Sequence, residues 1–260
     1  MSGTEEGREI VERLNERGVD VVTTVATEYG HEIYEKIGLG HLCLQGRLDI
    51  TGLSGLIHDK NIKTLIDATH PYAAQASLNA IKVSEECGIK YIRFQRPSTV
   101  LDSACTDKTD IKELESVHFV KNVDEAVEWC RKSDRKNILL TTGFSSVEKF
   151  VKLKDEKNIY IRMLPMPVPI EQCVRMGIKS SNILALQGPF TLELNKAIFN
   201  QYHIDVVITK DSGKTGGVQE KIQAAMEMGI DTVVIKREEI DYPVICSSID
   251  EVFSMLGVEQ

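Results

Sequence analysis

The chain has 260 residues, of which 42% are hydrophobic, and its formal net charge at pH 7 is -8. This length and apolar content suit one large α/β domain or two domains of ordinary size. The acidic balance argues against a general nucleic-acid-binding protein, which needs clustered lysine and arginine, although it leaves room for local basic sites.

Neither a membrane span nor a secretory signal is predicted. The apolar runs fall short of the ~20 residues that cross a bilayer, and the N-terminus lacks a signal-peptide pattern. Six cysteines are scattered without a C-x-x-C pair, which is typical of free thiols in a reducing compartment. We therefore expect a cytoplasmic protein with no membrane partner and no structural metal.

Strand-like apolar runs alternate with amphipathic helical runs, a pattern that predicts mainly parallel sheets covered by helices on both faces. The predicted strands cover residues 19–24, 42–45, 64–67, 91–94, 138–140, 159–163, 183–186, 206–209 and 232–235. Residues 98–116 break this rhythm, because they are polar and have little periodicity. We predict an α/β protein of two Rossmann-like domains, residues 1–110 and 111–260, with a ligand cleft between them.

Two short segments resemble each other and support a two-part build. Residues 119–127 and 245–253 both have the pattern of a short strand, a capping residue and an acidic first helical turn. Asn122 is followed by Glu125, and Ser248 by Glu251, at the spacing of a reciprocal helix cap. Either one such segment closes each domain, or two generic strand-to-helix junctions are alike by chance.

The strand predicted at residues 206–209 leads into a polar loop with three glycines and then into a helical pattern over residues 218–228. A phosphate loop of the nucleotide-hydrolase type would need glycine at position 208, which is isoleucine. The glycines still allow a ligand to approach the backbone closely, and a helix start favours anions. A solvated glycine-rich turn explains the loop equally well.

Three other predicted strands also end in polar residues. The polar groups at these ends are Asp67, Thr69, His70, Thr141, Thr142, Gly143 and Gln187. The carboxyl ends of parallel strands share one edge of a sheet, and open α/β sheets bind ligands at that edge. We therefore expect Thr69, Thr142, Gln187 and Asp211 to gather around a common cleft.

Seven motifs occur in chain order: GTEEGR at residues 3–8, IDATHPYA at 66–73, YIRFQRP at 91–97, LLTTG at 139–143, RMLP at 162–165, QGPF at 187–190 and KDSGKTGG at 210–217. Together they resemble the precorrin-6A and cobalt-precorrin-6A reductase family of cobalamin biosynthesis. The resemblance implies an oxidoreductase that acts on a CH–CH group. It would transfer hydride from NADPH or NADH to a double bond of precorrin-6A, or of its cobalt form, and give the 6B compound.

The resemblance also implies roles for particular residues. The expected cofactor-binding residues are Gly3, Thr4, Arg8, Thr27, Tyr29, Asp67, Thr69, Thr142 and Gly143. The substrate carries many carboxylates, so basic groups must face it although the whole protein is acidic. The expected substrate-binding residues are Arg93, Arg96, Arg162, Gln187, Lys210, Gly213, Gly216 and Gly217, with Lys214 as a further candidate. Only one arginine of the Arg93 and Arg96 pair is expected to bind substrate, and the other to cap a sheet edge or pair with a local acid.

Hydride transfer must be accompanied by a proton, for which Asp211, Ser212 and His70 are the candidate donors. His70 precedes Pro71, so a backbone hydrogen bond in a tight turn is an alternative role for its ring. Solvent and a substrate carboxyl are alternative proton sources. Residues 25–30 offer hydroxyls and an acid near the expected ribose position, which leaves the choice between NADPH and NADH open.

The start of the chain departs from the family pattern, in which an apolar strand leads into Gly-Gly-Thr. Here the sequence opens with Met1-Ser2-Gly3-Thr4. The first strand of a doubly wound sheet is usually central, so its loss would leave neighbouring strands with unpaired backbone groups. Either the start codon is assigned downstream of the true one, which is our interpretation, or the protein compensates for the absent strand in another way.

Two other classes of protein fit the strand-end polar groups. A tetrapyrrole methyltransferase-like enzyme, or another nucleotide-using transferase, would use a similar open sheet with a different cofactor. A non-catalytic small-molecule-binding protein would share the cleft without a nucleotide site. The resemblance favours the reductase, with a corrinoid precursor as substrate, no nucleic-acid partner, and room for transient contact with other corrin-pathway enzymes.

Overall fold

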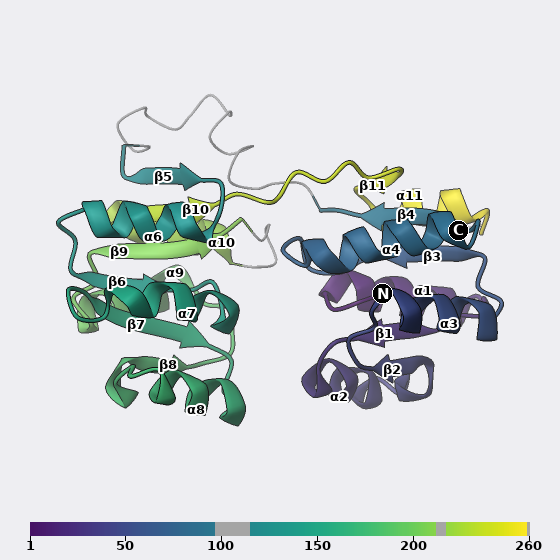
Figure 1. The fold of residues 1–260 in the computed structure, drawn as a ribbon, viewed down its shortest axis with the longest axis horizontal. Coiled ribbons are helices and arrows are strands. Elements are labelled where there is room, and N and C mark those ends of the chain that lie inside the picture. Colours follow the sequence, from purple (N-terminus) through teal and green to yellow (C-terminus); the bar gives the residue numbers. More distant parts are fainter. Residues whose placement is uncertain (97–114, 212–216, 259–260) are drawn as a thin grey trace. The chain divides into compact units, whose positions relative to one another are not determined.

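The structure is a computed structural model that describes residues 1–96, 115–211 and 217–258. The chain divides into two compact units (Figure 1). The first unit contains residues 1–97 and 239–260, and the second contains residues 98–238. Parallel strands alternate with helices in each unit, which confirms the predicted α/β class.

The first unit is built from short parallel strands with helices between them. In chain order it contains α1 (Glu5–Glu16), β1 (Thr23–Val25), α2 (Glu28–Lys36), β2 (Cys43–Gln45), α3 (Ile50–Asp59), β3 (Thr64–Asp67), α4 (Ala74–Glu86), β4 (Lys90–Phe94), β11 (Ile245–Cys246) and α11 (Ile249–Leu256). β1 pairs with β2, and β4 lies between β3 and β11. Its core includes Ile10 and Leu14 of α1 packed near Ile92 of β4 and Phe253 of α11.

Met1 and Ser2 lie between β1 and β3, where a central strand would run. The N–H of Ser2 donates to the carbonyl of Thr24 at 3.0 Å, and the carbonyl of Met1 accepts from the N–H of Ala68 at 2.9 Å. The α-amino group of Met1 donates to the carbonyl of Ile66 at 2.9 Å, and burial lowers its pKa below the ordinary 8.0. Within the described residues, these two residues alone bridge β1 and β3.

A cavity of about 630 Å³ lies between β1 and β3, beside the place that Met1 and Ser2 occupy. Residues from both flanking strands and from the helices on either side line it, among them Ile10, Thr24, Leu53 and Leu65. Apart from the contacts of Met1 and Ser2, the facing edges of β1 and β3 are therefore unpaired in the described residues. β1 is also shorter than the strand predicted at residues 19–24, because residues 19–22 have no neighbouring strand to pair with in the described part of the chain.

The described residues of the second unit form a parallel sheet of six strands in the order β5-β10-β9-β6-β7-β8. Its elements are β5 (Val117–Val120), α6 (Val123–Lys132), β6 (Asn137–Leu140), α7 (Val147–Phe150), β7 (Asn158–Met163), α8 (Pro167–Arg175), β8 (Ile183–Ala185), α9 (Leu192–Gln201), β9 (Val206–Lys210), α10 (Val218–Glu227) and β10 (Asp231–Ile235). Leu139 and Val207 of the sheet pack with Phe199 of α9 and Ala225 of α10. Burial on both faces explains the apolar runs by which these strands were predicted.

The division of the chain differs from the prediction of domains at residues 1–110 and 111–260. Residues 239–260 belong to the first unit, because β11 pairs with β4 through Ile245 and Cys246 and α11 packs on the same core. The boundary in the middle of the chain falls at residues 97 and 98. The first unit is therefore completed by a strand from the far end of the sequence, whereas the second unit is one continuous segment.

The two similar segments found in the sequence have equivalent positions. β5 and β11 are each an edge strand of their sheet, which agrees with one such segment closing each domain. Asn122 and Ser248 cap the following helices by accepting from the N–H groups of Glu125 and Glu251. Those two glutamates accept in return from the N–H groups of Lys121 and Ser247, one residue before each cap.

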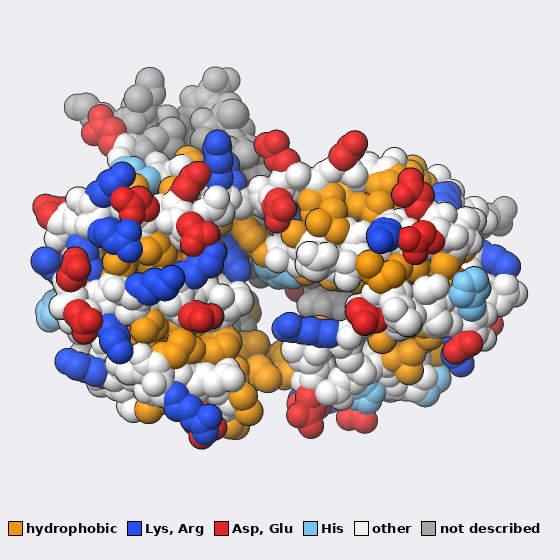
Figure 2. Space-filling model, in the orientation of Figure 1, with side chains coloured by type: hydrophobic (Ala, Val, Ile, Leu, Met, Phe, Trp, Pro, Cys, Tyr) orange, Lys and Arg blue, Asp and Glu red, His pale blue; other side chains and the backbone are white. Residues whose placement is uncertain are grey.

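The surface carries charges of both signs. On the face shown in Figure 2, lysine and arginine side chains are interspersed with aspartate and glutamate. In the described residues, no helix has both the length and the apolar character that would let it cross a membrane.

A chain extended by five apolar, β-forming residues before Met1 is expected to be more stable. The added strand would fill the cavity, pair with the open edges of β1 and β3, and replace the buried α-amino group. Thermal unfolding should show a Tm higher by several degrees, since about 1 kcal/mol shifts Tm by roughly 2–4 °C in proteins of similar size. A Gly-Ser extension of equal length is the control, and equal Tm values for the two extended chains would contradict the expectation.

Candidate functional site

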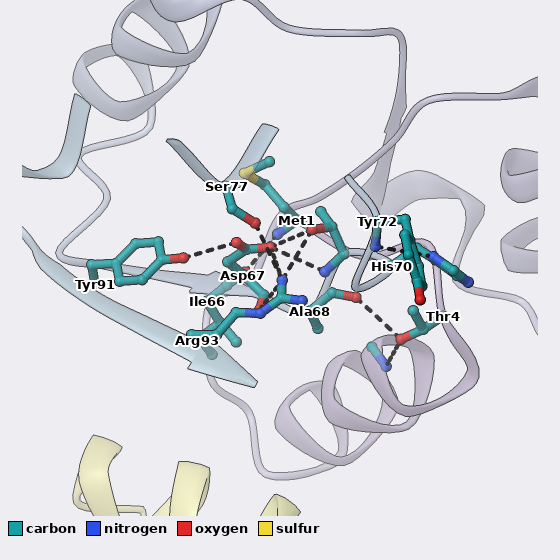
Figure 3. Close-up of polar contacts among 12 residues, drawn as sticks. Met1, Thr4, Ile66, Asp67, Ala68, His70, Tyr72, Ser77, Tyr91 and Arg93 are labelled. Carbon is teal, nitrogen blue, oxygen red and sulfur yellow. Dashed lines mark hydrogen bonds and ion pairs between the residues drawn. The ribbon is translucent and has the colours of Figure 1, made fainter. Parts of the chain in front are cut away.

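A buried ion pair lies at the carboxyl end of β3 in the first unit (Figure 3). The carboxylate of Asp67 and the guanidinium of Arg93 are 2.9 Å apart, with 0% and 1% of the side chains exposed. The backbone N–H and hydroxyl of Thr69 donate to Asp67 at 3.0 and 2.7 Å, and the hydroxyl of Tyr91 donates to it at 2.8 Å. The two charged residues are register partners on adjacent parallel strands.

Electrostatics keep Asp67 ionised. Burial alone would raise the pKa of its carboxyl, but the charge of Arg93 and hydrogen bonds from Ser77 and Thr69 outweigh burial and lower it below the ordinary 3.8. Burial, and then the negative charge of Asp67, raises the pKa of Tyr91. The network therefore stabilises one fixed charge state at the strand end.

This geometry corrects two sequence predictions. Arg93 was expected to face the substrate and Asp67 to contact the cofactor, but both side chains are buried and satisfy each other. Thr69 is bound into the same network and also accepts from Arg93 at 3.1 Å. The role that these contacts support is positioning of the loop that follows β3.

The start of α1 lies next to this network and has the features of a phosphate-binding helix start. Thr4 caps the helix, accepts from the N–H of Gly7 and donates to the carbonyl of Ala68, both at 3.1 Å. A Cβ on Gly7 would come within 2.8 Å of the Ser2 side chain, so glycine lets the helix pack closely against the chain before it. Gly3 is exposed, and nothing lies within 4 Å of the place where its Cβ would be. Arg8 follows one turn further on and is half-buried.

Three other predicted residues of the first unit lie at a helix start or in an ion pair. Thr27 caps α2 by accepting from the N–H of Gly30 at 3.1 Å, and Tyr29 follows it in the first turn. Arg96 pairs with Glu6 at 3.2 Å, so both arginines of the pair have acid partners instead of the one that was expected.

His70 lies at the end of the loop after β3, and its side chain is exposed. Its Nδ1 accepts from the N–H of Tyr72 at 3.3 Å, which is the alternative role that the sequence suggested for it. The rings of the two residues are 5.8 Å apart.

Polar groups of the second unit lie at one edge of its sheet. Thr142 and Gly143 follow β6, Gln187 follows β8 and Asp211 follows β9, and all these strands are parallel members of one sheet. Thr142 is buried and its hydroxyl bonds that of Ser146. Gly143 has a φ of 78°, a backbone conformation that favours glycine. Thr69, the fourth group expected at the common cleft, belongs to the first unit.

Asp211 does not project from a loop as the sequence suggested. Its side chain is buried and lies 3.6 Å from the Nε of Arg237, which also donates to the carbonyl of Asp211 at 2.9 Å. The N–H of Asp211 donates to the carbonyl of Ile235. Asp211 therefore joins the ends of β9 and β10, a structural contact that the predicted catalytic role did not include.

Positive side chains gather at the same edge. Lys210 ends β9, and burial lowers its pKa. Arg162 lies near the end of β7, buried, with its guanidinium 4.1 Å from the ring centre of Phe190. Lys221, which was not predicted, is buried in the first turn of α10 and donates to the hydroxyl of Thr209 at 3.2 Å. The signal for it was a lysine on the apolar face of a helix, beside Val218 and Ala225.

Several predicted residues lie outside the described residues: Ser212, Gly213, Lys214 and Gly216. Gly217 is described, and its φ of 59° precedes the first residue of α10. In the described part of the chain, no group of three or more histidine, cysteine, aspartate or glutamate side chains could hold a metal ion.

Parallel sheets with polar groups at their carboxyl ends define an α/β ligand-binding protein of the Rossmann-like class. The profile of the family described as Precorrin-6x reductase CbiJ/CobK matches residues 1–257. The chain therefore belongs to this family, which confirms the resemblance found in the motifs.

Relatives agree with this assignment. The chain is 36% identical over 244 residues to a protein of Methanothermobacter thermautotrophicus named cobalt-precorrin-6A reductase, covering 93% of this chain and 76% of the relative. It is 33% identical over 267 residues to one of the same name from Priestia megaterium, covering 98% and 96%. A solved structure titled CobK precorrin-6A reductase matches with a TM-score of 0.74 and 21% identity over 98% of this chain and 94% of that one, which supports the fold.

The substitution Asp67→Asn is expected to destabilise the protein strongly, because it leaves Arg93 buried without a counter-charge. The expected loss is about 3–5 kcal/mol, measured by urea unfolding. Because the pKa of Asp67 is lowered by folding, its contribution should persist above pH 3.8 and disappear as the pH falls below that value. Glu128→Gln, which removes the exposed pair with Arg131, is the control and should cost at most about 1 kcal/mol. Equal losses in the two variants would contradict the account.

Proposed function

We propose that this protein reduces one double bond of precorrin-6A, or of cobalt-precorrin-6A, with hydride from NADPH or NADH and gives the 6B compound. The observation that carries the proposal is the family match over residues 1–257. The relatives named cobalt-precorrin-6A reductase support the cobalt-bearing form as substrate. A transferase would use a similar sheet, but no observation on this chain favours it over the reductase.

The first unit supplies a suitable place for a dinucleotide. Gly3 leaves the start of α1 open, Gly7 permits close packing of the helix, and the N-terminal N–H groups of a helix attract phosphate. Thr4 and Arg8 are the side chains proposed to lie nearest the phosphates, and Thr27 and Tyr29 those nearest the ribose. Bound there, the nicotinamide would supply the hydride, and the protein would hold it in place and exclude water. Neither ribose neighbour selects between NADPH and NADH.

A proton must reach the carbon next to the one that receives hydride. His70 is exposed, and its Nδ1 accepts a backbone N–H, so the neutral ring carries its proton on Nε2 and can donate from there. Asp211 and Ser212 stay predictions for this step, as does transfer from solvent. The reaction is balanced when one hydride and one proton add across the double bond and oxidised nicotinamide leaves.

The second unit supplies groups suited to a carboxylate-rich ring. Lys210 ends β9 and Gln187 follows β8, so both lie at the carboxyl edge of one sheet, with β6 and β7 between the two strands. The exposed side chains of Leu164 and Leu186 offer apolar surface at the ends of β7 and β8. Apolar surface with a few fixed polar groups is typical of small-molecule sites. A shared cleft with the first unit, and contact with other corrin-pathway enzymes, stay predictions.

Oxidation of reduced nicotinamide in the presence of substrate tests this function directly. The protein is expected to remove the absorbance of NADPH or NADH only when precorrin-6A or cobalt-precorrin-6A is added, with the 6B compound as product. Running all four combinations assigns both the cofactor and the metal state of the substrate. No oxidation with any combination would refute the reductase assignment.

Ligand-dependent thermal stabilisation separates the reductase from the other classes. A reduced nicotinamide at about 100 times its Kd should stabilise the folded protein by about 2.7 kcal/mol, seen as a rise in Tm. S-adenosylmethionine and ATP at the same concentration should leave Tm unchanged. Stabilisation by S-adenosylmethionine alone would favour the methyltransferase-like alternative.

A further inference from the structure

Three buried cations of the second unit, Lys157, Arg162 and Lys221, form no ion pair within the described residues. Lys157 comes just before β7, at the amino edge of the sheet, and donates to the backbone carbonyls of Ser133 and Arg135 at 2.6 and 2.7 Å. The other two lie near the carboxyl edge.

Arg162, in β7, has 5% of its surface exposed, and Lys221, in α10, has 7%. The guanidinium donates to the Oδ1 of Asn195 at 2.8 Å, and the ammonium donates to the hydroxyl of Thr209 at 3.2 Å. Both acceptors are neutral, so they solvate the positive charges without compensating them.

The two cations also influence each other. Burial, and then the positive charge of Arg162, lowers the pKa of Lys221 to about 7, and the carboxylate of Glu220 opposes this shift only in part. Burial lowers the pKa of Arg162 to about 10. At neutral pH the arginine is therefore charged, and about half of the Lys221 side chains are neutral.

Neighbouring groups hold the guanidinium in one orientation. The amide nitrogen of Asn195 donates to the carbonyls of Phe190 and Thr191 at 3.4 and 2.8 Å, which turns its oxygen toward Arg162. The ring of Phe190 lies 4.1 Å from the centre of the guanidinium. An arginine fixed in this way keeps its planar array of donors ready for a bidentate acceptor.

The position of the pair in the fold is that of a ligand-binding group. Arg162 and Thr209 are the penultimate residues of β7 and β9, and Lys221 lies in the first turn of the helix that follows β9. All three are therefore close to the carboxyl edge of the sheet, where open α/β sheets bind ligands. Lys157 is held by backbone carbonyls alone, but it lies at the amino end of β7, away from this edge.

We propose that Arg162 and Lys221 form the binding site for one carboxylate side chain of the macrocyclic substrate. The inference rests on the proposed function, because the carboxylate belongs to that substrate. Arg162 supplies the permanent charge and the paired donors, and Lys221 supplies a second charge. Binding at this site breaks no bond of the substrate.

Binding is linked to a proton at this site. A carboxylate beside Lys221 favours the ammonium form, so a lysine that is neutral in the free protein takes one proton from solvent when the substrate binds. The groups that face Lys221 act in different directions: the charge of Arg162 opposes its protonation, the carboxyl of Glu220 favours it, and the hydroxyl of Thr209 is neutral. Proton uptake should therefore be near one at pH 8 and should become small at pH 6, where Lys221 is already protonated.

The first arm of the test uses the unchanged protein. Cobalt-precorrin-6A is titrated into it by calorimetry at pH 6 and pH 8, each in two buffers that differ in ionisation enthalpy, without nicotinamide. The expected result is uptake of close to one proton per substrate at pH 8 and little at pH 6. Absence of uptake at pH 8, with binding observed, overturns the inference.

The second arm compares Lys221→Met with Lys132→Met, an exposed helical lysine of the same unit. Loss of a buried charge partner should raise KM roughly tenfold or more, with kcat changed far less, and should abolish the proton uptake. The control should leave KM and uptake unchanged. Because folding lowers the pKa of Lys221, removing its charge should leave Tm at pH 7 unchanged or higher. A lower Tm with an unchanged KM would show that Lys221 has a structural role, and the inference would be wrong.

The outcomes also separate this inference from the proposed function. Turnover without proton uptake on binding would support the reductase function and refute the carboxylate-binding site. Proton-linked binding without oxidation of the nicotinamide would support the carboxylate-binding site and refute the reductase function. If Lys221→Met does not fold, the calorimetric result on the unchanged protein decides.

Discussion

Every paired strand in both units runs parallel to its neighbour, so within each sheet all carboxyl ends lie along one edge. Helices must then return the chain to the other edge after each strand, and the loops at the carboxyl edge are free to carry polar groups. This is why residues as distant in sequence as Thr142, Gln187 and Lys210 come to the same edge of the second unit. The parallel topology therefore brings these strand-end residues to one edge of the sheet, whichever side chains they carry.

Buried charge is compensated at some of these strand ends, including that of Asp211 with Arg237 after β9, and not at others. In the first unit, Asp67 and Arg93 neutralise each other, and Tyr91 and Thr69 donate further hydrogen bonds to Asp67. In the second, Arg162 and Lys221 meet only neutral acceptors. A closed network fixes a loop, whereas uncompensated cations favour an anionic ligand. The contrast agrees with a nucleotide held mainly by backbone in the first unit and a carboxylate-rich ring held by cations in the second.

Much of the fold could be predicted from the sequence, because the apolar runs of buried parallel strands are strong local signals. The strand at residues 64–67 has the predicted bounds, and the caps at Asn122 and Ser248 follow from spacing alone. The return of residues 239–260 could not be predicted, since β11 has only two residues and its partner β4 is some 150 positions earlier in the sequence. Pairing over such a separation leaves no local pattern.

The candidate site was predicted less well than the fold. Strand ends were correctly located, but whether a charged side chain there faces a ligand or a neighbour depends on register, and Asp67 opposite Arg93 is a register effect. Lys221 was not predicted, because the criterion applied to the sequence was a polar residue at a strand end and not one on a helix face. Its position among Val218 and Ala225 is a signal that sequence alone contains.

The central claim is that hydride passes from a nicotinamide to the macrocycle. Single turnover of cobalt-precorrin-6A with reduced nicotinamide deuterated at its transferable position, in ordinary water, tests it most directly. The account predicts a 6B product heavier by about one mass unit than the product made with unlabelled cofactor. The deuterium is placed on one face of the nicotinamide ring and then on the other, in separate reactions. A product of unchanged mass in both reactions would contradict the account.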